Sequence, residues 1–240
     1  MALDVWLLEQ QVQGKQPPTL RFYGWEPAAI SLGYHQKRWP EAWATLRWQG
    51  QPLDLVQRPS GGRAVLHQGD LTYSLVTSGL RGNSGFTGSR AAVYRQVCEF
   101  LVMGWRSLRS PLSYGSAGRG YIHNPNCFGT ATGADLVLAN GAKLIGSAQL
   151  WRSRVLLQQG SMRLNPDPVL LAAFGETGPL PDLPEYLLGP EGRERVMAAL
   201  LAAAQTCWGV TFERRELSEA DWAEVLQRPC SGLEAEDRPV

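Results

Sequence analysis

The chain has 240 residues, of which 44% are hydrophobic and 19% are charged. That composition is typical of a globular protein and excludes a disordered chain, and the length fits one large domain with a sizeable core. With 23 basic and 22 acidic residues the net charge is only +1, which argues against a general nucleic-acid binder and against a protein drawn to anionic membranes.

The first fifty residues predict a helix, two strands and a second helix. Residues 1–13 carry apolar side chains at helical spacing, and Gly14 ends the pattern. The segment has no basic start, so it is not a signal peptide. Residues 19–25 and 28–33 are predicted as short strands, and residues 37–50 as a helix.

The middle of the chain predicts two strands and a long helix separated by loops. One strand starts at Leu53, and residues 71–76 alternate as in a second strand. Residues 79–89 have the composition of a loop, and residues 90–108 carry the apolar stripe of a helix. Residues 110–133 have no regular pattern, and because loops of that length are usually functional or disordered, we favour a functional loop.

The last part of the chain predicts a hairpin, a strand and three helices. The hairpin spans residues 134–151, where Asn140-Gly141 supplies the two positive-φ residues of a type I′ turn. The later elements are a strand at 154–158, with 162–164 after a break, helices at 167–174, at 190–207 and from Ser218, and a frayed tail at 230–240. No apolar run reaches 18 residues, so no transmembrane helix is expected. Together these elements predict one α+β domain over residues 1–229, with a mixed, largely antiparallel sheet covered by helices.

Four cysteines are scattered through the chain without a CxxC pair or a metal-ligand spacing. They indicate free thiols in a reducing cytoplasm, and with only three histidines a metal site is not expected. Cys98 and Cys207 lie in helical stripes and are interpreted as core residues, and Cys230 lies in the polar tail. Cys127 differs because it lies in the long loop between polar, Gly and Pro neighbours, where a thiol near cations can act as a nucleophile.

The segment with the densest functional signal is residues 58–67, which read RPSGGRAVLH. Two adjacent glycines allow a sharp turn with bare backbone N–H groups, and the arginine on either side can hold a carboxylate or a phosphate. The alternative is a tight turn between two strands with no ligand, and the residue types alone leave both interpretations open. The candidate binding residues of this segment are Arg58, Gly61, Gly62, Arg63 and His67.

Lys143 follows the predicted hairpin turn and is one of only three lysines in a chain with 20 arginines. A lysine there is ordinarily a solvated strand residue, but the small residues Gly146, Ser147 and Ala148 after it allow another group to approach the strand. A desolvated lysine beside a thiol can accept its proton or stabilise its charge. Cys127 and Lys143 are therefore the candidate catalytic residues.

These segments, in this order and spacing, resemble the biotin/lipoate protein ligase superfamily, with its lipoate-protein ligase A-like domain, and within it the LipM-type octanoyltransferase branch. Residues 58–75 resemble the superfamily's Arg-x-x-Gly-Gly-x-Ala-Val-x-His signature and the Leu-x-Tyr-Ser strand that follows it. Residues 142–151, AKLIGSAQLW, resemble its Lys-x-x-Gly-Ser-Ala-Gln strand. The NCF at 126–128 resembles the Cys-Phe pair of the LipM-type branch, and the resemblance extends over residues 1–175.

The resemblance implies a biotin/lipoate ligase-like catalytic domain and an octanoyl transfer in lipoate biosynthesis. The donor would be octanoyl-acyl carrier protein, and the acceptor a lysine of a lipoyl-domain protein such as the glycine cleavage H protein. Cys127 would attack the donor thioester and carry the acyl group while Lys143 assists proton transfer. Thioester exchange is nearly isoenergetic and amide formation is downhill, so no cofactor is implied. The residues that would line the acyl tunnel and meet the phosphopantetheine of the donor are Arg58, Gly61, Gly62, Arg63, His67, Gly146, Ser147 and Ala148.

Two positions depart from the family's pattern, since Val5 replaces an acid and Gln159-Gly160 stands where relatives have His-Gly. Three alternatives therefore stay open. They are a lipoate–protein ligase that requires ATP and Mg²⁺, an octanoyl amidotransferase that acts between lipoyl domains, and a catalytically silent paralogue that binds acyl groups or proteins.

The donor in this family is an acidic carrier protein, and basic side chains would attract it. The arginines expected to help dock it are Arg119, Arg152, Arg154 and Arg163. No nucleic-acid partner and no membrane partner is expected.

Overall fold

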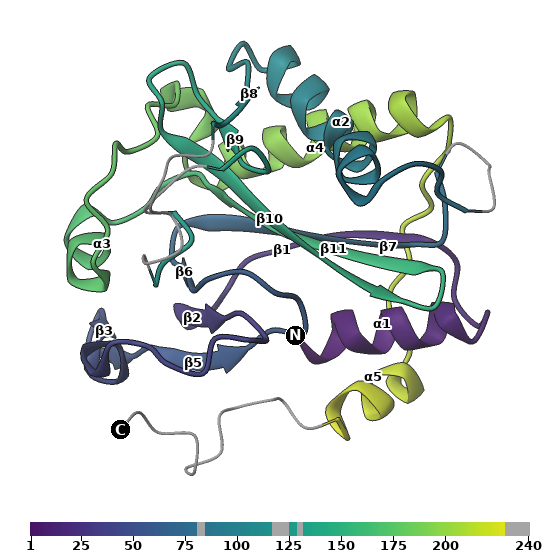
Figure 1. Cartoon of the computed structure of the whole chain (residues 1–240), viewed down its shortest axis with the longest axis horizontal. Helices are drawn as coiled ribbons and strands as arrows, with labels where there is room; N and C mark the ends of the chain where they lie inside the picture. The colour runs from purple at the N-terminus through teal and green to yellow at the C-terminus, as the bar shows by residue number, and fades with distance from the viewer. Residues whose placement is uncertain (81–84, 117–124, 129–131, 229–240) are drawn as a thin grey trace.

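The computed structural model describes residues 1–80, 85–116, 125–128 and 132–228. Its centre is a six-stranded sheet in which every neighbouring pair is antiparallel (Figure 1). The strand order is β1 (Thr19–Tyr23), β7 (Asp70–Thr77), β11 (Val155–Arg163), β10 (Lys143–Arg152), β9 (Leu136–Val137) and β8 (Ser113–Tyr114). The predicted α+β class with a largely antiparallel sheet is therefore confirmed.

The two longest strands, β10 and β11, form a hairpin in the middle of this sheet. Their register pairs Arg152 with Val155 at the tip and Gly146 with Ser161 nearer the other end. All nine residues of β11 are buried, because helices cover both faces of the sheet, and a strand buried on both faces loses its polar–apolar alternation. For that reason the sequence suggested two pieces, at 154–158 and 162–164, where the structure has one continuous strand.

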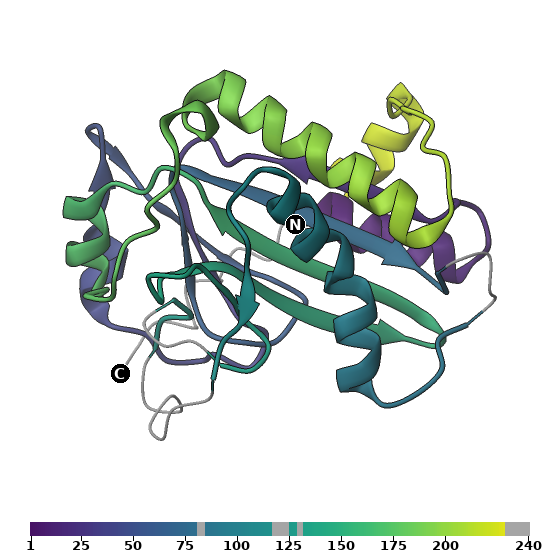
Figure 2. The same cartoon turned by 90° about the horizontal axis from the view of Figure 1, so that it is seen from above.

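Helices α2 (Arg90–Ser107) and α4 (Gly189–Trp208) pack against each other on one face of the central sheet (Figure 2). Phe100 and Trp105 of α2 and Leu200 of α4 are fully buried in the same apolar cluster as side chains of the strands. A short 3₁₀ helix, η3 (Glu185–Leu187), leads into α4. No helix among the described residues is long and apolar enough to cross a membrane.

The opposite face of the sheet is covered by α1 (Ala2–Val12), with α5 (Glu219–Leu226) beneath it (Figure 1). Trp6 of α1 is buried against β7 and β11, and its indole N–H donates to Glu224 of α5 over 2.8 Å. Ser218 and Asp221 form the capping box that the sequence predicted for α5. Helix α1 also carries Asp4, whose carboxylate is fully buried.

A second, three-stranded sheet lies beside the central one, in the order β5 (Asp54–Gln57), β2 (Ala29–Leu32) and β6 (Val65–His67). Strand β2 is parallel to β5 and antiparallel to β6. Its core includes Trp43 of the 3₁₀ helix η1 (Glu41–Thr45), which stacks on Phe174 of α3 (Pro168–Phe174). Strands β2 and β6 of this small sheet supply Ser31, Val65 and His67 to the second wall of the site described below.

A tight turn joins the two sheets between β6 and β7. Gly69 in this turn has a φ of +65°, and a Cβ at this position would lie 1.8 Å from the carbonyl oxygen of Asn165. Only glycine meets both conditions. The turn brings His67, at the end of β6, next to Asp70, at the start of β7.

The helix predicted over residues 37–50 is wrong. The structure has only the short η1 there, followed by a small hairpin of β3 (Arg47–Trp48) and β4 (Gln51–Pro52). Gln49 and Gly50 both have positive φ, at 49° and 80°, which is the requirement of a type I′ two-residue turn. Trp39 and Trp43 of this segment fill the core of the small sheet, and Trp48 packs against it.

The predicted hairpin around Asn140-Gly141 is present, but its turn type differs from the prediction. Only Gly141 has positive φ, at 81°. The Gly141 N–H donates to the Leu138 carbonyl over 2.9 Å, and the Asn140 side chain accepts from the Ala142 N–H. This is the longer turn that ends in a left-handed glycine, rather than the two-residue type I′ form.

The other predicted helices, at 1–13, 90–108, 167–174 and 190–207, are confirmed. Strand β6 was not predicted, because its three residues lie within the 58–67 motif. Parts of the predicted loops at 79–89 and 110–133, and the predicted tail at 230–240, lie outside the described residues.

Candidate active site

The segment that carries Cys127 is held by backbone hydrogen bonds between the two sheets. The Cys127 N–H donates to the Ala64 carbonyl over 2.7 Å, and the Ala64 N–H donates to the Pro125 carbonyl over 3.1 Å. The buried side chain of Asn126 donates to the carbonyl of Gly175, at the end of α3. These contacts fix the backbone at Cys127 without using its thiol.

The side chain of Lys143 lies directly beside Cys127. Its Nζ is 3.3 Å from the Cys127 Sγ, 2.7 Å from the Cys127 carbonyl oxygen and 2.8 Å from Oδ1 of Asp135. Lys143 and Asp135 are buried, with exposed fractions of 5% and 4%. An ammonium group has three hydrogens, and these three acceptors account for all of them. The structure thus brings the two predicted catalytic residues together and adds Asp135, which the sequence did not point to.

Gly146 leaves the space that this arrangement needs. A Cβ at this position would lie 3.0 Å from Lys143 Cε, 3.2 Å from Nζ and 3.5 Å from the Cys127 Sγ. A Cβ at 146 would therefore crowd the end of the Lys143 side chain and would touch the Cys127 Sγ at an ordinary contact distance.

We expect Gly146→Ala to fold but to react with acyl donor roughly 10- to 100-fold more slowly, because displacements well below 1 Å at reacting groups are costly. The measurement is the rate at which an acyl group appears on the protein by intact mass. Gly178→Ala is the matched control, since a Cβ there meets no atom within 4 Å. Equal rates for Gly146→Ala and wild type would show that the space at Gly146 is not needed for the reaction at Cys127.

Phe128 and Arg163 lie on one side of the Cys127–Lys143 pair. The Arg163 guanidinium lies 3.9 Å from the centre of the Phe128 ring and pairs with Glu176, and Lys143 Nζ is 4.8 Å from the same ring. Burial lowers the pKa of Arg163 and raises the pKa of Glu176, and in each group the partner's charge opposes the effect of burial. Arg163 and Lys143 therefore place two positive charges around Cys127.

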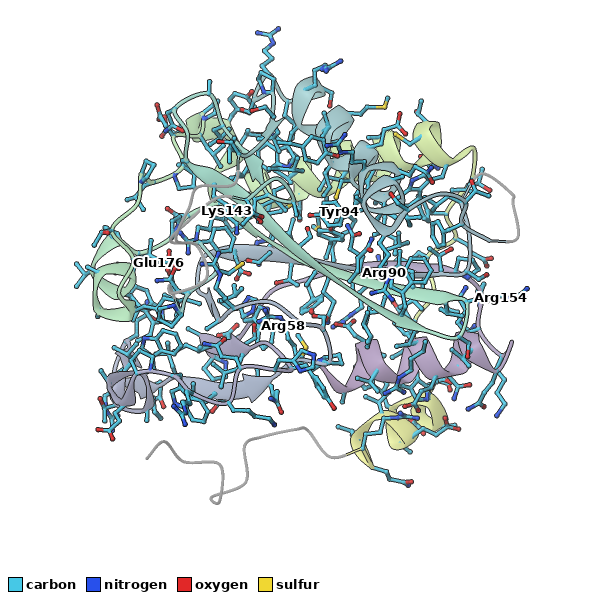
Figure 3. All side chains as sticks on the ribbon, in the orientation of Figure 1. Arg58, Arg90, Tyr94, Lys143, Arg154 and Glu176 are labelled. Atoms are coloured by element: carbon cyan, nitrogen blue, oxygen red, sulfur yellow. The ribbon has the colours of Figure 1, made fainter. Side chains whose placement is uncertain are left out.

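The expected role of Arg163 in docking a carrier protein is wrong, because its side chain is buried in this ion pair. Arg152 pairs with Glu9, and it lies with the exposed Arg154 at the tip of the β10–β11 hairpin, at the opposite end of the molecule from Lys143 (Figure 3). Arg119 lies outside the described residues.

The 58–67 segment forms a turn whose centre is Arg58. All five N–H groups of its buried guanidinium are used within the protein, by the carbonyl oxygens of Ser31, Gly61 and Arg63 and by Ser31 Oγ. Burial lowers the pKa of Arg58, and the nearby Cys127 opposes this shift. Arg58 therefore holds the turn in shape through its N–H groups, and it also lines the cavity described next.

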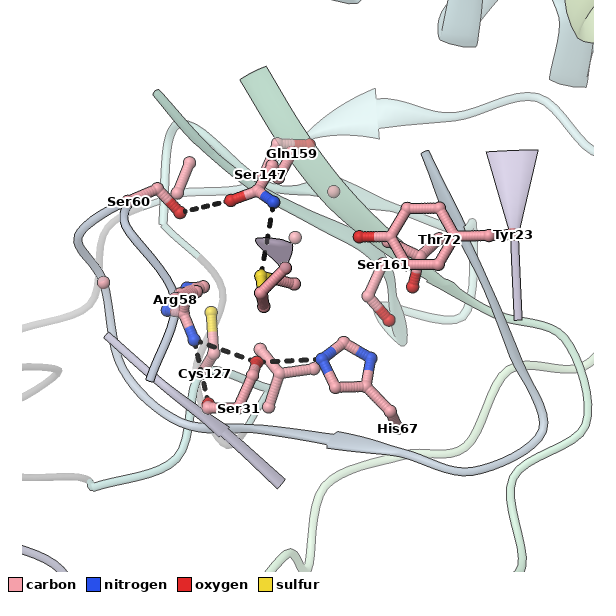
Figure 4. A pocket seen from close by; sticks show the side chains of 16 residues that line it. Tyr23, Ser31, Arg58, Ser60, His67, Thr72, Cys127, Ser147, Gln159 and Ser161 are labelled. Carbon is pink, nitrogen blue, oxygen red and sulfur yellow. Dashed lines mark hydrogen bonds between the residues drawn. The ribbon is translucent and has the colours of Figure 1, made fainter. Parts of the chain in front are cut away.

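Arg63 contacts the reactive segment itself, since its Nη2 donates to the Cys127 carbonyl over 3.3 Å. The turn brings Gly62 to the edge of a cavity that encloses about 450 Å³, its open mouth included (Figure 4). Among the sequence candidates, the residues that line it are Arg58, Gly62, His67, Cys127, Gly146, Ser147 and Ala148. Gly61, Arg63 and Lys143 are not among the lining residues.

The cavity also has lining residues that the sequence did not single out as a site. They are Met1, Tyr23, Ser31, Ser60, Val65, Thr72, Gln159, Gly160 and Ser161. Most are small or polar residues of β1, β2, β7 and β11, and their positions facing the cavity depend on strand register, which the sequence does not specify.

A buried carboxylate connects α1 to this cavity. Asp4 accepts hydrogen bonds from Arg21 over 2.6 Å, from Ser74 over 2.7 Å and from Tyr23 over 3.0 Å. It also accepts from Nε2 of Gln159 over 2.6 Å, and Oε1 of Gln159 accepts from Ser60 over 3.0 Å. The side chain of Gln159 is therefore held from both ends.

The described cysteines differ in environment. Burial raises the pKa of Cys98 to about 11, and Cys207 is buried as well, whereas Cys127 is half-buried at the cavity. The core interpretation of Cys98 and Cys207 is therefore confirmed, and Cys230 lies outside the described residues.

Because the thiolate is the reactive form and Cys98 and Cys207 are buried, we expect iodoacetamide near neutral pH to modify Cys127 well before Cys98 or Cys207. Peptide mapping after short exposures gives the order, and guanidinium-unfolded protein supplies the control in which all thiols react. Labelling of Cys127 no faster than of Cys98 would favour a catalytically silent paralogue.

Comparisons with known proteins agree with this geometry. The family model described as lipoyl protein ligase A/B catalytic domain matches residues 1–178. Octanoyltransferase LipM of Kyrpidia tusciae is 38% identical over 180 residues, which are 72% of this chain and 64% of that protein. Octanoyltransferase LipM of Symbiobacterium thermophilum is 34% identical over 243 residues, which are 99% of this chain and 77% of that protein.

Solved structures show the same fold at low sequence identity. A lipoate-protein ligase A bound with ATP has a TM-score of 0.67 and 20% identity, with 94% of this chain and 86% of that chain covered. A bi-partite lipoate protein ligase from Thermoplasma acidophilum has a TM-score of 0.65 and 17% identity, with the same 94% and 86% covered.

Proposed function

The chain belongs to the lipoyl protein ligase A/B catalytic domain family, and from this premise and the Cys127–Lys143 pair we propose that it is a LipM-type octanoyltransferase. It takes octanoyl from octanoyl-acyl carrier protein and delivers it to a lysine of a lipoyl-domain protein, such as the glycine cleavage H protein. The observation that carries the proposal is the 3.3 Å approach of Lys143 Nζ to the Cys127 Sγ at the wall of a cavity.

In the first half-reaction the Cys127 thiolate attacks the donor thioester. A new C–S bond forms to Cys127, the old C–S bond breaks, and the donor thiolate leaves and takes a proton from solvent. An ammonium group at hydrogen-bond distance stabilises negative charge on the sulfur that it faces. Lys143, held by Asp135, supplies that charge before the attack and again when Cys127 leaves the acyl group.

The small residues on β10 and β11 make room for the acyl chain. Gly146, Ala148 and Gly160 line the cavity and add almost no side-chain volume. Cys127 lies in the same lining, so a chain bound to its sulfur extends along these two strands.

In the second half-reaction the amine of the acceptor lysine attacks the acyl group on Cys127. The product is an amide, which is more stable than a thioester, so the transfer proceeds without ATP. A ligase differs from a transferase because it must first activate a free acid.

The test gives the protein a lipoyl domain and three donors in separate reactions. They are octanoyl-acyl carrier protein without ATP, free octanoate with ATP and Mg²⁺, and a second lipoyl domain that is already octanoylated. We expect modification of the acceptor, read by intact mass, with the carrier-protein donor. Modification with free acid and ATP only would identify a ligase, modification with the octanoylated domain only would identify an amidotransferase, and none in any arm would favour a silent paralogue.

A further inference from the structure

A second polar array crosses the same cavity and takes no part in the mechanism above. Ser31 Oγ lies 2.8 Å from Nε2 of His67, and Nδ1 of His67 lies 2.8 Å from Oδ2 of Asp70. Nη1 of Arg58 donates to Ser31 Oγ over 3.2 Å. Ser31 and His67 both line the cavity with Cys127 (Figure 4). The array thus connects the cavity to a carboxylate behind it.

The two ends of the array set the direction of its hydrogen bonds when His67 is neutral. Burial raises the pKa of Asp70, but the charge of protonated His67 and hydrogen bonds from His67, Ser161 and Thr72 outweigh it and hold the pKa below its usual value. With Asp70 as a carboxylate, Nδ1 of His67 donates to it. In the neutral ring, which is the starting state of the relay proposed below, Nε2 accepts from the Ser31 hydroxyl, whose oxygen accepts from Arg58, a group that only donates.

This arrangement leaves one acceptor site of Ser31 Oγ unused. A hydroxyl has one hydrogen and two lone pairs. The hydrogen goes to His67 and one lone pair to Arg58, so the second lone pair remains for a ligand N–H in the cavity. The ring of Trp25 stacks on His67 at 4.1 Å and 16° and keeps the imidazole in its plane.

The transfer to a lysine releases a proton that Lys143 is poorly placed to accept. The attacking amine must lose a proton before the amide is complete. All three hydrogens of the Lys143 ammonium are engaged, one of them by the Asp135 carboxylate. As an ammonium, Lys143 has no lone pair to receive another proton. A second proton acceptor in the cavity would let Lys143 keep these contacts throughout the transfer.

We propose that Ser31 and His67 form a proton relay for the second half-reaction, in which Ser31 receives the proton of the attacking lysine and passes its own to His67. The inference rests on the proposed octanoyl transfer and assigns a base to its second step. It changes His67 from the expected substrate-binding residue into a proton acceptor.

The step balances in atoms and charge. The N–C bond forms between the lysine nitrogen and the acyl carbon, the C–S bond breaks, and its electron pair stays on Cys127 as a thiolate facing Lys143. The amine proton moves to Ser31 Oγ while the former hydroxyl proton moves to Nε2. The resulting imidazolium keeps its bond to Asp70 and later loses its proton to solvent.

The charged groups around His67 favour this cycle. Asp70 faces its Nδ1, and Arg58 contacts its partner Ser31. Arg163 and Tyr23 interact electrostatically with Asp70. Arg193 donates a hydrogen bond to the backbone carbonyl of Asp70. Cys127 lines the same cavity as His67. Asp70 is the one carboxylate in direct contact with the ring among the described residues, and it stabilises the imidazolium once formed.

The test separates the two half-reactions in the complete protein. Octanoyl-acyl carrier protein is added first to load Cys127, and a lipoyl domain is added second, with both rates followed by rapid-quench intact mass. We expect His67→Gln to load within about threefold of wild type and to transfer to the lipoyl domain about 10² to 10⁴ times more slowly, which is the usual contribution of a general base. Raising the pH should partly rescue the variant, because hydroxide then removes the proton.

Three further variants serve as checks on this result. Ser31→Ala should show the same selective loss, and His67→Asn, which retains an N–H toward Asp70, serves if His67→Gln does not fold. His35→Gln is the matched control, since His35 is exposed and lies outside the cavity.

Different results of this experiment would overturn the relay or the proposed octanoyl transfer. Equal losses in loading and transfer would make His67 a positioning residue and overturn the relay, as would normal transfer in His67→Gln. Failure of wild type to load at all would instead contradict the proposed octanoyl transfer.

Discussion

Cys127→Ser and Cys127→Ala are expected to abolish the acyl-enzyme, with no octanoyl detectable on the protein and turnover lowered by at least about 10⁴-fold, as for removal of a covalent nucleophile. The reason is that a serine hydroxyl beside an ammonium stays protonated, and alanine offers no nucleophile. The measurement is the rate of acceptor octanoylation together with intact mass of the enzyme after mixing with donor.

Loss of fold does not explain this expected result. The backbone at Cys127 is held by Ala64, and the Cys127 carbonyl still accepts from Lys143 and Arg63 in either variant. Both variants should therefore unfold at nearly the wild-type temperature. Cys230→Ser is the control for removal of a thiol elsewhere and should keep full activity. Normal turnover in Cys127→Ser would remove Cys127 from the mechanism.

Removal of the Lys143 ammonium is expected to slow the loading of Cys127 by about 10² to 10⁴-fold, because the thiolate loses the positive charge that faces it. Lys143→Ala alone also leaves the buried carboxylate of Asp135 without its partner, which costs about 3–5 kcal/mol of stability. The double variant Lys143→Met with Asp135→Asn removes both charges and keeps the acceptor that Asp135 offers to Thr132.

The double variant therefore distinguishes catalysis from folding. We expect it to recover most of the stability lost in Lys143→Ala while loading stays slow. Thermal unfolding and the loading rate, measured on the same samples, give the two quantities. Lys15→Ala is the control, since Lys15 is exposed. Wild-type loading by the double variant would show that the ammonium is not needed.

The sequence was sufficient to single out Cys127 and Lys143 as candidates, because both lie in local motifs whose residue types and order carry the resemblance. It also predicted most helices, since their apolar stripes repeat at short range. The structure places Cys127 and Lys143 side by side, as expected, although their roles stay predictions until the variants are measured.

The features that the sequence did not predict depend on contacts between distant segments. Gln159 contacts Asp4, which lies 155 residues earlier, and Ser60 contacts Gln159 across 99 residues. Ser31 faces His67 across 36 residues, because β2 pairs with β6. No local spacing encodes such pairs, so the contacts of Gln159 with Asp4 and Ser60, and the Ser31–His67–Asp70 array, depend on how distant segments pack.

The expectations about two arginines rest on the same property of the residue type. Arg58 and Arg163 were expected to meet ligands because arginine is usually exposed and binds anions. Each is buried and satisfied by groups of the protein itself. The residue type shows that a side chain is able to bind an anion. The packing around it decides whether its N–H groups are free to do so.

The most direct test of the central claim is an intact mass of the wild-type protein after mixing with octanoyl-acyl carrier protein in the absence of ATP, followed by peptide mapping. The account predicts one octanoyl group, carried on Cys127 and released by hydroxylamine as a thioester is. An octanoyl group on another residue, or octanoylated lipoyl domain without any acyl-enzyme under single-turnover conditions, would contradict it.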